Sequence, residues 1–184
     1  MENLQQCMAD TRFSIRELDV SELSIVREIA RCTWPVSYKH MISEEQIEYM
    51  LEWMYNDSAL KHQWNEEKAH FYQISLNNYP IGFASIGPES QETSQHFKLH
   101  KLYVLPNFQS TGAGSALMRH CILTYTTMGA CQISLQVNRQ NSAVAFYNKH
   151  GFVIQSEIKV DIGNGYFMDD FIMTRQLKSN TTEY

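Results

Sequence analysis

The stretch Leu102–Leu117 reads LYVLPNFQSTGAGSAL, and its layout decides which fold the chain adopts. An apolar run ends at Pro106, a polar turn follows, and Gln109–Gly114 leads into a segment with helical spacing. Gly112 and Gly114 let the main chain approach a ligand closely and adopt dihedral angles that other residues resist. Because the first N–H groups of a helix lack partners and carry partial positive charge, this turn is suited to a pyrophosphate.

Two common phosphate-binding motifs do not match this turn. A P-loop ends in Gly-Lys-Ser/Thr, and no such triplet follows Gly114. The dinucleotide-binding fingerprint needs G-x-G-x-x-G beside the first strand of its domain, which is not the arrangement here. Taken alone, the G-x-G is equally compatible with a helix that only packs tightly on a sheet. A second motif has to decide between binding and packing.

That second motif follows the expected strand Ile133–Val137, where Asn141–Phe152 reads NSAVAFYNKHGF. Together with Q-x-x-G-x-G at Gln109–Gly114, it resembles the two linked motifs of the GNAT superfamily of N-acetyltransferases. The resemblance is specific over roughly residues 97–155, and the order of elements extends it to most of the chain. It implies a GNAT fold with acetyl-CoA as cosubstrate.

The periodicity along the chain predicts an α/β (α+β) domain that is not doubly wound. Strands are expected over 13–18, 71–76, 81–86, 97–105, 133–137, 152–161 and 166–177. Helices are expected over 22–32, from 44 onwards, 57–64, 112–128 and 142–149. The first has Leu23, Val26, Ile29 and Ala30 on one face. The Trp34-Pro35 step should end this helix, because a residue before proline avoids the helical region. Ser43–Gln46 has the capping-box layout.

With the resemblance, this order predicts a seven-stranded, mostly antiparallel mixed sheet flanked by helices, with a splayed parallel strand pair. Acetyl-CoA lies between those two strands in the family. Main-chain groups of the strand should pair with the pantetheine arm, and amides of the turn should hold the pyrophosphate. The residues that the resemblance implies for acetyl-CoA are Leu102, Tyr103, Val104, Gln109, Ser110, Thr111, Gly112, Ala113, Gly114, Asn141 and Tyr147. Ser110 and Thr111 stand where relatives often carry Arg or Lys. Asn141 is alternatively the N-cap of the short helix.

Two candidate catalytic residues follow from the same resemblance. Tyr147 resembles the tyrosine whose hydroxyl protonates the departing thiolate of coenzyme A, and its alternative role is a core aromatic side chain. Some relatives use a glutamate as base on the strand before the turn, where Lys98 stands nearest here. His100, expected on the same strand face as Lys98 and Leu102, can accept a proton directly or through water, unless it is a structural histidine. Glu157 is a second candidate base.

The acceptor site is expected in the first half of the chain. Trp34 and Tyr38, in the loop after the first helix, can wall the acceptor channel, since aromatic faces bind ammonium groups; core packing is the alternative. The run Trp34–Tyr38 and the helix ending in Glu52–Tyr55 look like bacterial members near the polyamine acetyltransferases. For the remaining groups we expect core packing at Trp53 and Tyr55, and solvated faces at Glu44–Glu45 and Asp169–Asp170.

Composition narrows the class of protein. The 184 residues are 43% hydrophobic and 19% charged, with a formal net charge of −5. This is too apolar for a disordered chain, and no dense basic cluster points to nucleic acid. No apolar run approaches the roughly 20 residues of a membrane helix, and no signal peptide is recognisable, so a cytoplasmic protein is expected. Cysteine and histidine spacings predict free thiols and no metal site.

The sequence therefore predicts one N-acetyltransferase domain over residues 1–184, with an ordered core at about 12–177 and frayed ends. It is expected to move an acetyl group from acetyl-CoA to a primary amine, a small amine or polyamine, by direct attack in a ternary complex. Two alternatives stay open: acetylation of a protein N-terminus or lysine, and an acyl-CoA sensor without catalysis. A small-molecule amine is the expected partner, with a homodimer possible.

Overall fold

The computed structural model describes residues 13–90 and 95–177. The expected frayed ends, 1–11 and 178–184, lie outside these residues. The strands are β1 Phe13–Glu17, β2 His70–Leu76, β3 Tyr79–Pro88, β4 His96–Val104, β5 Gln132–Asn138, β6 Val153–Gly163 and β7 Tyr166–Gln176. The helices are η1 Val20–Glu22, α1 Ser24–Ser37, α2 Glu44–Tyr55, α3 Asp57–Asn65, η2 Pro106–Phe108, α4 Ala113–Thr127 and α5 Ala143–Lys149.

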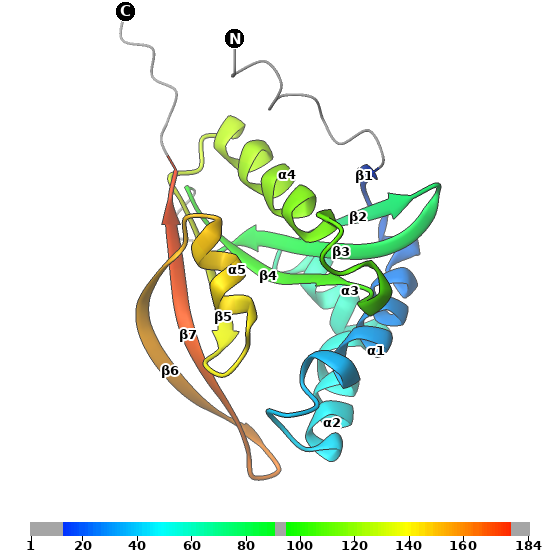
Figure 1. Cartoon of the computed structure of the whole chain (residues 1–184), viewed down its shortest axis with the longest axis vertical. Helices are drawn as coiled ribbons and strands as arrows, with labels where there is room; N and C mark the ends of the chain where they lie inside the picture. The colour runs from blue at the N-terminus through cyan, green and yellow to red at the C-terminus, as the bar shows by residue number, and fades with distance from the viewer. Residues whose placement is uncertain (1–12, 91–94, 178–184) are drawn as a thin grey trace, which may run out of the picture.

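All seven strands form one sheet in the order β1-β2-β3-β4-β5-β7-β6. Every neighbouring pair is antiparallel except β4 and β5, which run parallel because α4 carries the chain back between them. The predicted mixed sheet with one parallel pair is thus confirmed. Helices α4 and α5 cover one face, and α1–α3 gather against the other (Figure 1).

Each face of the sheet has its own hydrophobic core. Beneath α4, Leu117 and Tyr125 are buried against the strands. On the other face, α1 buries the side chains that the helical spacing predicted: Leu23, Val26, Ile29 and Ala30. Burial of such amphipathic faces is what holds short helices in place. The sheet is therefore sandwiched, and a cleft that crosses it must open at its edge or where two strands part.

Helix α1 is longer than predicted. It runs through Pro35 to Ser37, and the Tyr38 amide donates to the Trp34 carbonyl oxygen at 3.0 Å. The prediction that the Trp34-Pro35 step ends the helix was wrong, because a proline in the last turn removes only one hydrogen bond. Packing of Trp34, which is 2% exposed, keeps the turn helical. Trp34 therefore lies in α1, and Tyr38 is its C-cap rather than a loop residue.

The start of α2 shows half of the predicted capping box. Ser43 Oγ accepts from the Gln46 amide at 3.2 Å, as the motif requires. The Gln46 side chain, however, donates to the Phe167 carbonyl oxygen of β7 at 3.0 Å. Tyr49 makes a second link, donating to the Ile162 carbonyl oxygen at 2.6 Å. These bonds fasten α2 to the long β6–β7 hairpin.

Other features bear on the predictions made from composition. Cys32, Cys121 and Cys131 are free thiols, while Cys7 lies outside the described residues. In the part of the chain that the structure describes, no helix is long and apolar enough to span a membrane.

Candidate active site

The site opens where β4 and β5 part. These strands pair only over His96–Leu99 and Gln132–Leu135, although β4 continues to Val104 and β5 to Asn138. A cleft with a volume of about 1020 Å³ occupies the gap and extends toward α1–α3. Because the two strands are parallel and diverge at the same end, the cleft reaches main-chain groups of both.

A β-bulge in β4 shapes this gap. The pairing with β3 shifts by one residue, so that Ser85 lies opposite Lys101 and Ile86 lies opposite Leu99. His100 is therefore an extra residue on β4 with no counterpart on β3. Such bulges bend a strand and redirect the side chains beyond them.

The bulge reverses the alternation of side chains along β4. Leu99 and Leu102 both contact the core beneath α4, whereas Lys98 faces the other way and donates to Gln136 Oε1 at 2.6 Å. The sequence placed Lys98, His100 and Leu102 on one face. This was wrong, because the two-residue period holds only in an uninterrupted strand.

His100 lines the cleft, but its chemistry is unusual for a base. Its Nε2 is buried and has no hydrogen-bond partner among the described residues. Burial, with the nearby charges of Lys101 and Lys98, lowers the pKa of His100 to about 3. The imidazole is therefore neutral at pH 7 and holds a transferred proton weakly. Its role as general base remains a prediction.

The glycine-containing turn forms one end of the cleft. Gly112 is the N-cap of α4 with a φ of 96°, and Ser110 also has a positive φ of 61°. Gln109 Nε2 donates to the Val104 carbonyl oxygen at 3.1 Å, which ties the turn to the end of β4. The first amides of α4 are thereby presented at the cleft with no acceptor inside the helix.

Most residues predicted for acetyl-CoA line this cleft. They are Leu102, Tyr103, Val104, Gln109, Ser110, Gly112, Gly114, Asn141 and Tyr147. Thr111 and Ala113 are not among the residues that line it. Thr111 Oγ1 instead donates to the Phe108 carbonyl oxygen at 2.7 Å, and Ala113 is buried in the core beneath α4. Any contact of these two with a ligand would have to use their main-chain groups.

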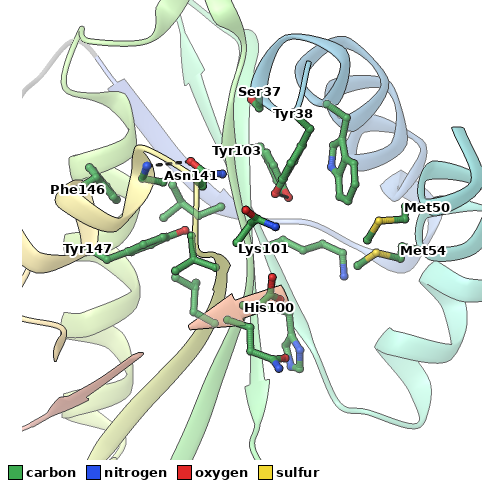
Figure 2. Close-up of a pocket in the computed structure, with 18 of the residues that line it drawn as sticks. Ser37, Tyr38, Met50, Met54, His100, Lys101, Tyr103, Asn141, Phe146 and Tyr147 are labelled. Atoms are coloured by element: carbon green, nitrogen blue, oxygen red, sulfur yellow. Dashed lines mark hydrogen bonds between the residues drawn. The ribbon is translucent and has the colours of Figure 1, made fainter. Parts of the chain in front are cut away.

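Asn141 lies two residues before α5, and the N-cap of this helix is Ser142 rather than Asn141. The Asn141 Oδ1 nevertheless accepts from the Ala143 amide at 2.8 Å, so its side chain bonds to the first turn of the helix (Figure 2). Asn141 also lines the cleft, and its side-chain nitrogen, Nδ2, can donate a hydrogen bond to another group there. The predicted bond to pantetheine remains a prediction.

Tyr147 projects from α5 toward the centre of the cleft (Figure 2). It is 9% exposed, and burial, together with the nearby Tyr38, raises the pKa of its hydroxyl above the ordinary value of 10. The group therefore carries its proton at neutral pH. A buried, protonated phenol facing a cleft has the properties of a proton donor.

Aromatic residues wall the opposite side. Tyr38 and Tyr103 join their hydroxyls at 3.0 Å, which fastens the end of α1 to β4. Trp34 packs on Tyr38 with ring centroids 4.5 Å apart, and its Nε1 donates to the Tyr55 hydroxyl at 3.2 Å. Trp34 and Tyr38 both line the cleft, as the resemblance implied. The hydroxyl of Tyr103 also belongs to this wall.

Lys101 was missed by the sequence analysis. It is 5% exposed, its amine donates to Gln63 Oε1, and it lies 5.5 Å from the centre of the Tyr55 ring. Burial lowers the pKa of Lys101 to about 8. A lysine on a polar strand has no sequence signal that separates it from a surface lysine. Its burial depends on the bulge and on Gln63 of α3 and Tyr55 of α2, which contact its amine.

Asp170 and Trp53 correct two further expectations. Asp170 was placed on a solvated face, but it is 8% exposed, lines the cleft, and has its pKa raised to about 6 by burial and by Asp169. Trp53 was placed in the core, but it is 48% exposed and lines the cleft. Tyr55 lies in the core, as predicted, and Glu44–Glu45 are exposed.

Glu157, the second candidate base, lies outside the cleft. It stands on the edge strand β6, and its carboxylate pairs with Arg139 at 2.8 Å. The Glu157 side chain is exposed and does not line the cleft, so its carboxylate is not placed to accept a proton from a group bound between β4 and β5. Among the described residues, no group of three His, Cys, Asp or Glu side chains is arranged to hold a metal ion.

Known proteins resemble this chain over most of its length. A spermidine N(1)-acetyltransferase of Thermoplasma acidophilum is 28% identical over 170 residues, or 90% of this chain and 98% of the relative. A [ribosomal protein bS18]-alanine N-acetyltransferase of Haemophilus influenzae is 28% identical over 145 residues, or 79% and 88%. A solved N-acetyltransferase of Thermoplasma acidophilum in complex with coenzyme A is 25% identical, with a TM-score of 0.73, covering 89% of this chain and 98% of that one.

The family model for the acetyltransferase (GNAT) domain matches residues 38–165. This range contains the bulged strand, the turn before α4 and the Asn141–Phe152 segment, which line much of the cleft, whereas the lining residues of α1 before Tyr38 and of β7 after Tyr166 lie outside it. The match and the cleft agree on the same part of the molecule. The chain therefore belongs to the GNAT family and is an N-acetyltransferase.

Proposed function

We propose that the protein transfers the acetyl group of acetyl-CoA to the primary amine of a small molecule. One observation carries this proposal: a single cleft joins the amide-lined turn before α4 to Tyr147 and to the aromatic wall of Trp34 and Tyr38. The turn fits a pyrophosphate and the gap between β4 and β5 fits an extended arm. The solved relative in complex with coenzyme A supports the same donor.

Acetyl-CoA, when bound, supplies the acetyl group as a thioester. The residues on the two sides of the gap then have separate roles. Trp34 and Tyr38 orient the amine, and its nitrogen forms a bond to the carbonyl carbon as the carbon–sulfur bond breaks. Tyr147 gives its proton to the departing sulfur, which is the role that its buried, protonated hydroxyl supports.

The acceptor amine, an ammonium at neutral pH, has to lose one proton to water before its nitrogen can attack, and a second proton as the amide forms. His100, whose Nε2 is buried and unpartnered, is the predicted recipient. Because its pKa lies near 3, it serves better as a relay that passes the proton to water than as a group that keeps it. The attacking nitrogen ends as a neutral amide, and Tyr147 regains its proton from solvent.

The relatives carry two different named acceptors. The spermidine N(1)-acetyltransferase supports the polyamine prediction, and the ribosomal-protein alanine N-acetyltransferase supports a protein N-terminus. Both acceptors present a primary amine, and at 28% identity neither name fixes the acceptor of this chain. The hydrogen bonds from Gln46 and Tyr49 join α2 to the β6–β7 hairpin beside the cleft, and this join favours a small molecule over a folded protein.

Acetyl-CoA turnover, followed as release of free thiol, tests this proposal. The panel holds spermidine, spermine, diamines, amino acids and short peptides, and calorimetry measures acetyl-CoA binding in parallel. Release with a small amine supports the proposal. Binding of acetyl-CoA with release only on peptides moves the acceptor to proteins, and binding with no release at all favours an acyl-CoA sensor. A chain that does not bind acetyl-CoA contradicts the proposal.

A further inference from the structure

Two lysines in the cleft lie in an unusual setting. Lys101 is 5% exposed and Lys98 is partly buried, yet each amine donates to a neutral glutamine: Lys101 to Gln63, and Lys98 to Gln136 at 2.6 Å. Neither forms an ion pair with any residue that the structure describes. Lys101 also lies 5.5 Å from the centre of the Tyr55 ring, but neither a ring face nor an amide oxygen carries the full negative charge that would offset the desolvation of a buried ammonium.

The surrounding charges do not replace that partner. Glu67 acts on both lysines, and Glu89 and Asp170 act on Lys98, all beyond the range of an ion pair. Burial outweighs these carboxylates, because the pKa of each lysine is lowered despite them. The cleft thus holds two positive charges with hydrogen-bond capacity to spare, since an ammonium has three donors.

The lysines do not face the phosphates of the donor. Strand residues rise about 3.3 Å each, which places Lys98 roughly 20 Å and Lys101 roughly 10 Å along β4 from Val104 and the turn. The Lys101 amine points away from Asn141 and Tyr147 and toward Met54 (Figure 2). Its charge therefore faces the side of the cleft where the acceptor enters.

That side of the cleft also has an apolar wall. Met50, Trp53 and Met54 contribute to it from α2, and Phe167 contributes from β7. Methionine side chains adapt to ligands of varied shape, and aromatic rings cover large apolar area. A cationic group beside such a wall matches a molecule that has one anionic end and an apolar body.

We propose that the acceptor is an amine that also carries a carboxylate and an apolar body, as an apolar amino acid does, and that Lys101, assisted by Lys98, binds the carboxylate. This rests on the proposed N-acetyltransferase function and narrows its substrate class. A free polyamine has only cationic groups, and it would bring like charges beside both lysines. The carboxylate supplies the counter-charge that the two glutamines do not.

Matched acceptors test the inference on the unaltered protein. Leucine, methionine and phenylalanine are each compared with the corresponding amide and with the amine that lacks the carboxyl group, and spermidine is included. We expect kcat/KM for the acid to exceed that for its amide at least about 30-fold, which is the usual loss when a buried charge pair loses one partner. Equal values, or a preference for spermidine or the amides, would overturn the inference.

Variants locate the recognition. Lys101→Met should remove the preference for the acid over the amide while leaving acetyl-CoA binding by calorimetry unchanged. Lys61→Met, which removes an exposed lysine of α3, is the control and should keep the preference. A preference retained in a folded Lys101→Met protein contradicts the assignment, and if that variant does not fold, Lys98→Met must reduce the preference.

The two proposals fail in different ways. A protein that binds acetyl-CoA and acetylates only amines without a carboxylate refutes the substrate class but keeps the transferase. A protein that does not bind acetyl-CoA refutes the proposed function and this inference with it.

Discussion

The two halves of the cleft are built in different ways. The half that we propose for the donor, formed by the end of β4, the turn before α4 and the start of α5, presents main-chain amides and helix ends to the cleft. The acceptor half relies on side chains from α1, α2, α3, β4 and β7, which the fold brings together from across the sequence. Main-chain N–H groups are present whatever the side chains are, so two short motifs are enough to predict the donor half. The side chains that we propose to determine acceptor specificity come from five elements and leave no motif in the sequence.

The hydroxyl of Tyr147 is where the two halves meet, and its removal has the largest expected effect. Tyr147→Phe should lower kcat about 10²- to 10⁴-fold, because the departing sulfur loses its proton donor. The affinity for acetyl-CoA should change less than twofold by calorimetry. Tyr125→Phe is the control, since this buried hydroxyl, in the core beneath α4, donates to the Ile86 carbonyl oxygen. An unchanged kcat in Tyr147→Phe would remove the tyrosine from the chemistry.

Lys101, in the acceptor half, should make the free energy of unfolding depend on pH. Below pH 8 it is charged in both folded and unfolded chains, and between its folded pKa of about 8 and its ordinary value of 10.5 only the unfolded chain holds the proton. The free energy of unfolding should therefore rise with pH, by about 2 kcal/mol between pH 7.5 and 9.5. Urea unfolding at the two pH values measures this rise. Lys101→Met should lack it, and an equal rise in the variant would assign the effect to other groups.

Gly112 tests how far the donor half depends on backbone geometry. Gly112→Ala forces a residue with a side chain to a φ of 96°, which costs about 1–2 kcal/mol and turns the first amides of α4. Acetyl-CoA affinity should fall about tenfold to hundredfold, the value of a lost hydrogen bond to a charged group. Gly129→Ala is the matched control, because its φ is 88° in open space at the other end of α4. It should lose similar stability and keep acetyl-CoA affinity, and equal binding losses in both variants would mean that only folding is affected.

The Tyr38–Tyr103 pair gives the smallest expected effect. Tyr38→Phe removes the 3.0 Å hydroxyl contact between α1 and β4, at a cost of about 1 kcal/mol in unfolding free energy. The acceptor KM should rise a few-fold, while acetyl-CoA affinity stays unchanged, because this contact belongs to the acceptor half. Tyr79→Phe, at an exposed position on β3, should alter neither quantity. A change in acetyl-CoA affinity in Tyr38→Phe would show that the halves are coupled.

Local patterns predicted the strands and the crossover, while the family resemblance supplied the arrangement of the sheet and the residues proposed for the donor half. Strand periodicity and the glycines after Pro106 act over a few residues, and the structure has strands near the predicted positions and a positive φ at Gly112. Pro35 shows the limit of such rules. Its effect on the helix depends on which turn it occupies and on the packing of Trp34, and neither is a local property.

The acceptor half was predicted only where the family resemblance reached. Trp34 and Tyr38, which line the cleft, were proposed in this way, whereas Lys101 and Asp170, which also line it, were not. A charged residue on a strand is ordinarily at the surface, and its burial depends on elements far away in the sequence. The bulge at His100 has no signal in the residue types around it, because it is visible only in the pairing with β3. This one extra residue decides which side chains of β4 face the acceptor.

Because β4 and β5 separate after a short paired region, only a narrow connection joins the two parts of the sheet. Among the described residues, strand pairing between β1–β4 and β5–β7 is limited to His96–Leu99 and Gln132–Leu135. Beyond that join, the β5-facing amides of β4 lie inside the molecule without a strand partner, so their hydrogen–deuterium exchange should be fast for residues at the centre of a sheet. A donor that pairs with them acts as a missing strand. Its binding should slow exchange on both sides of the gap and make two half-sheets move as one body.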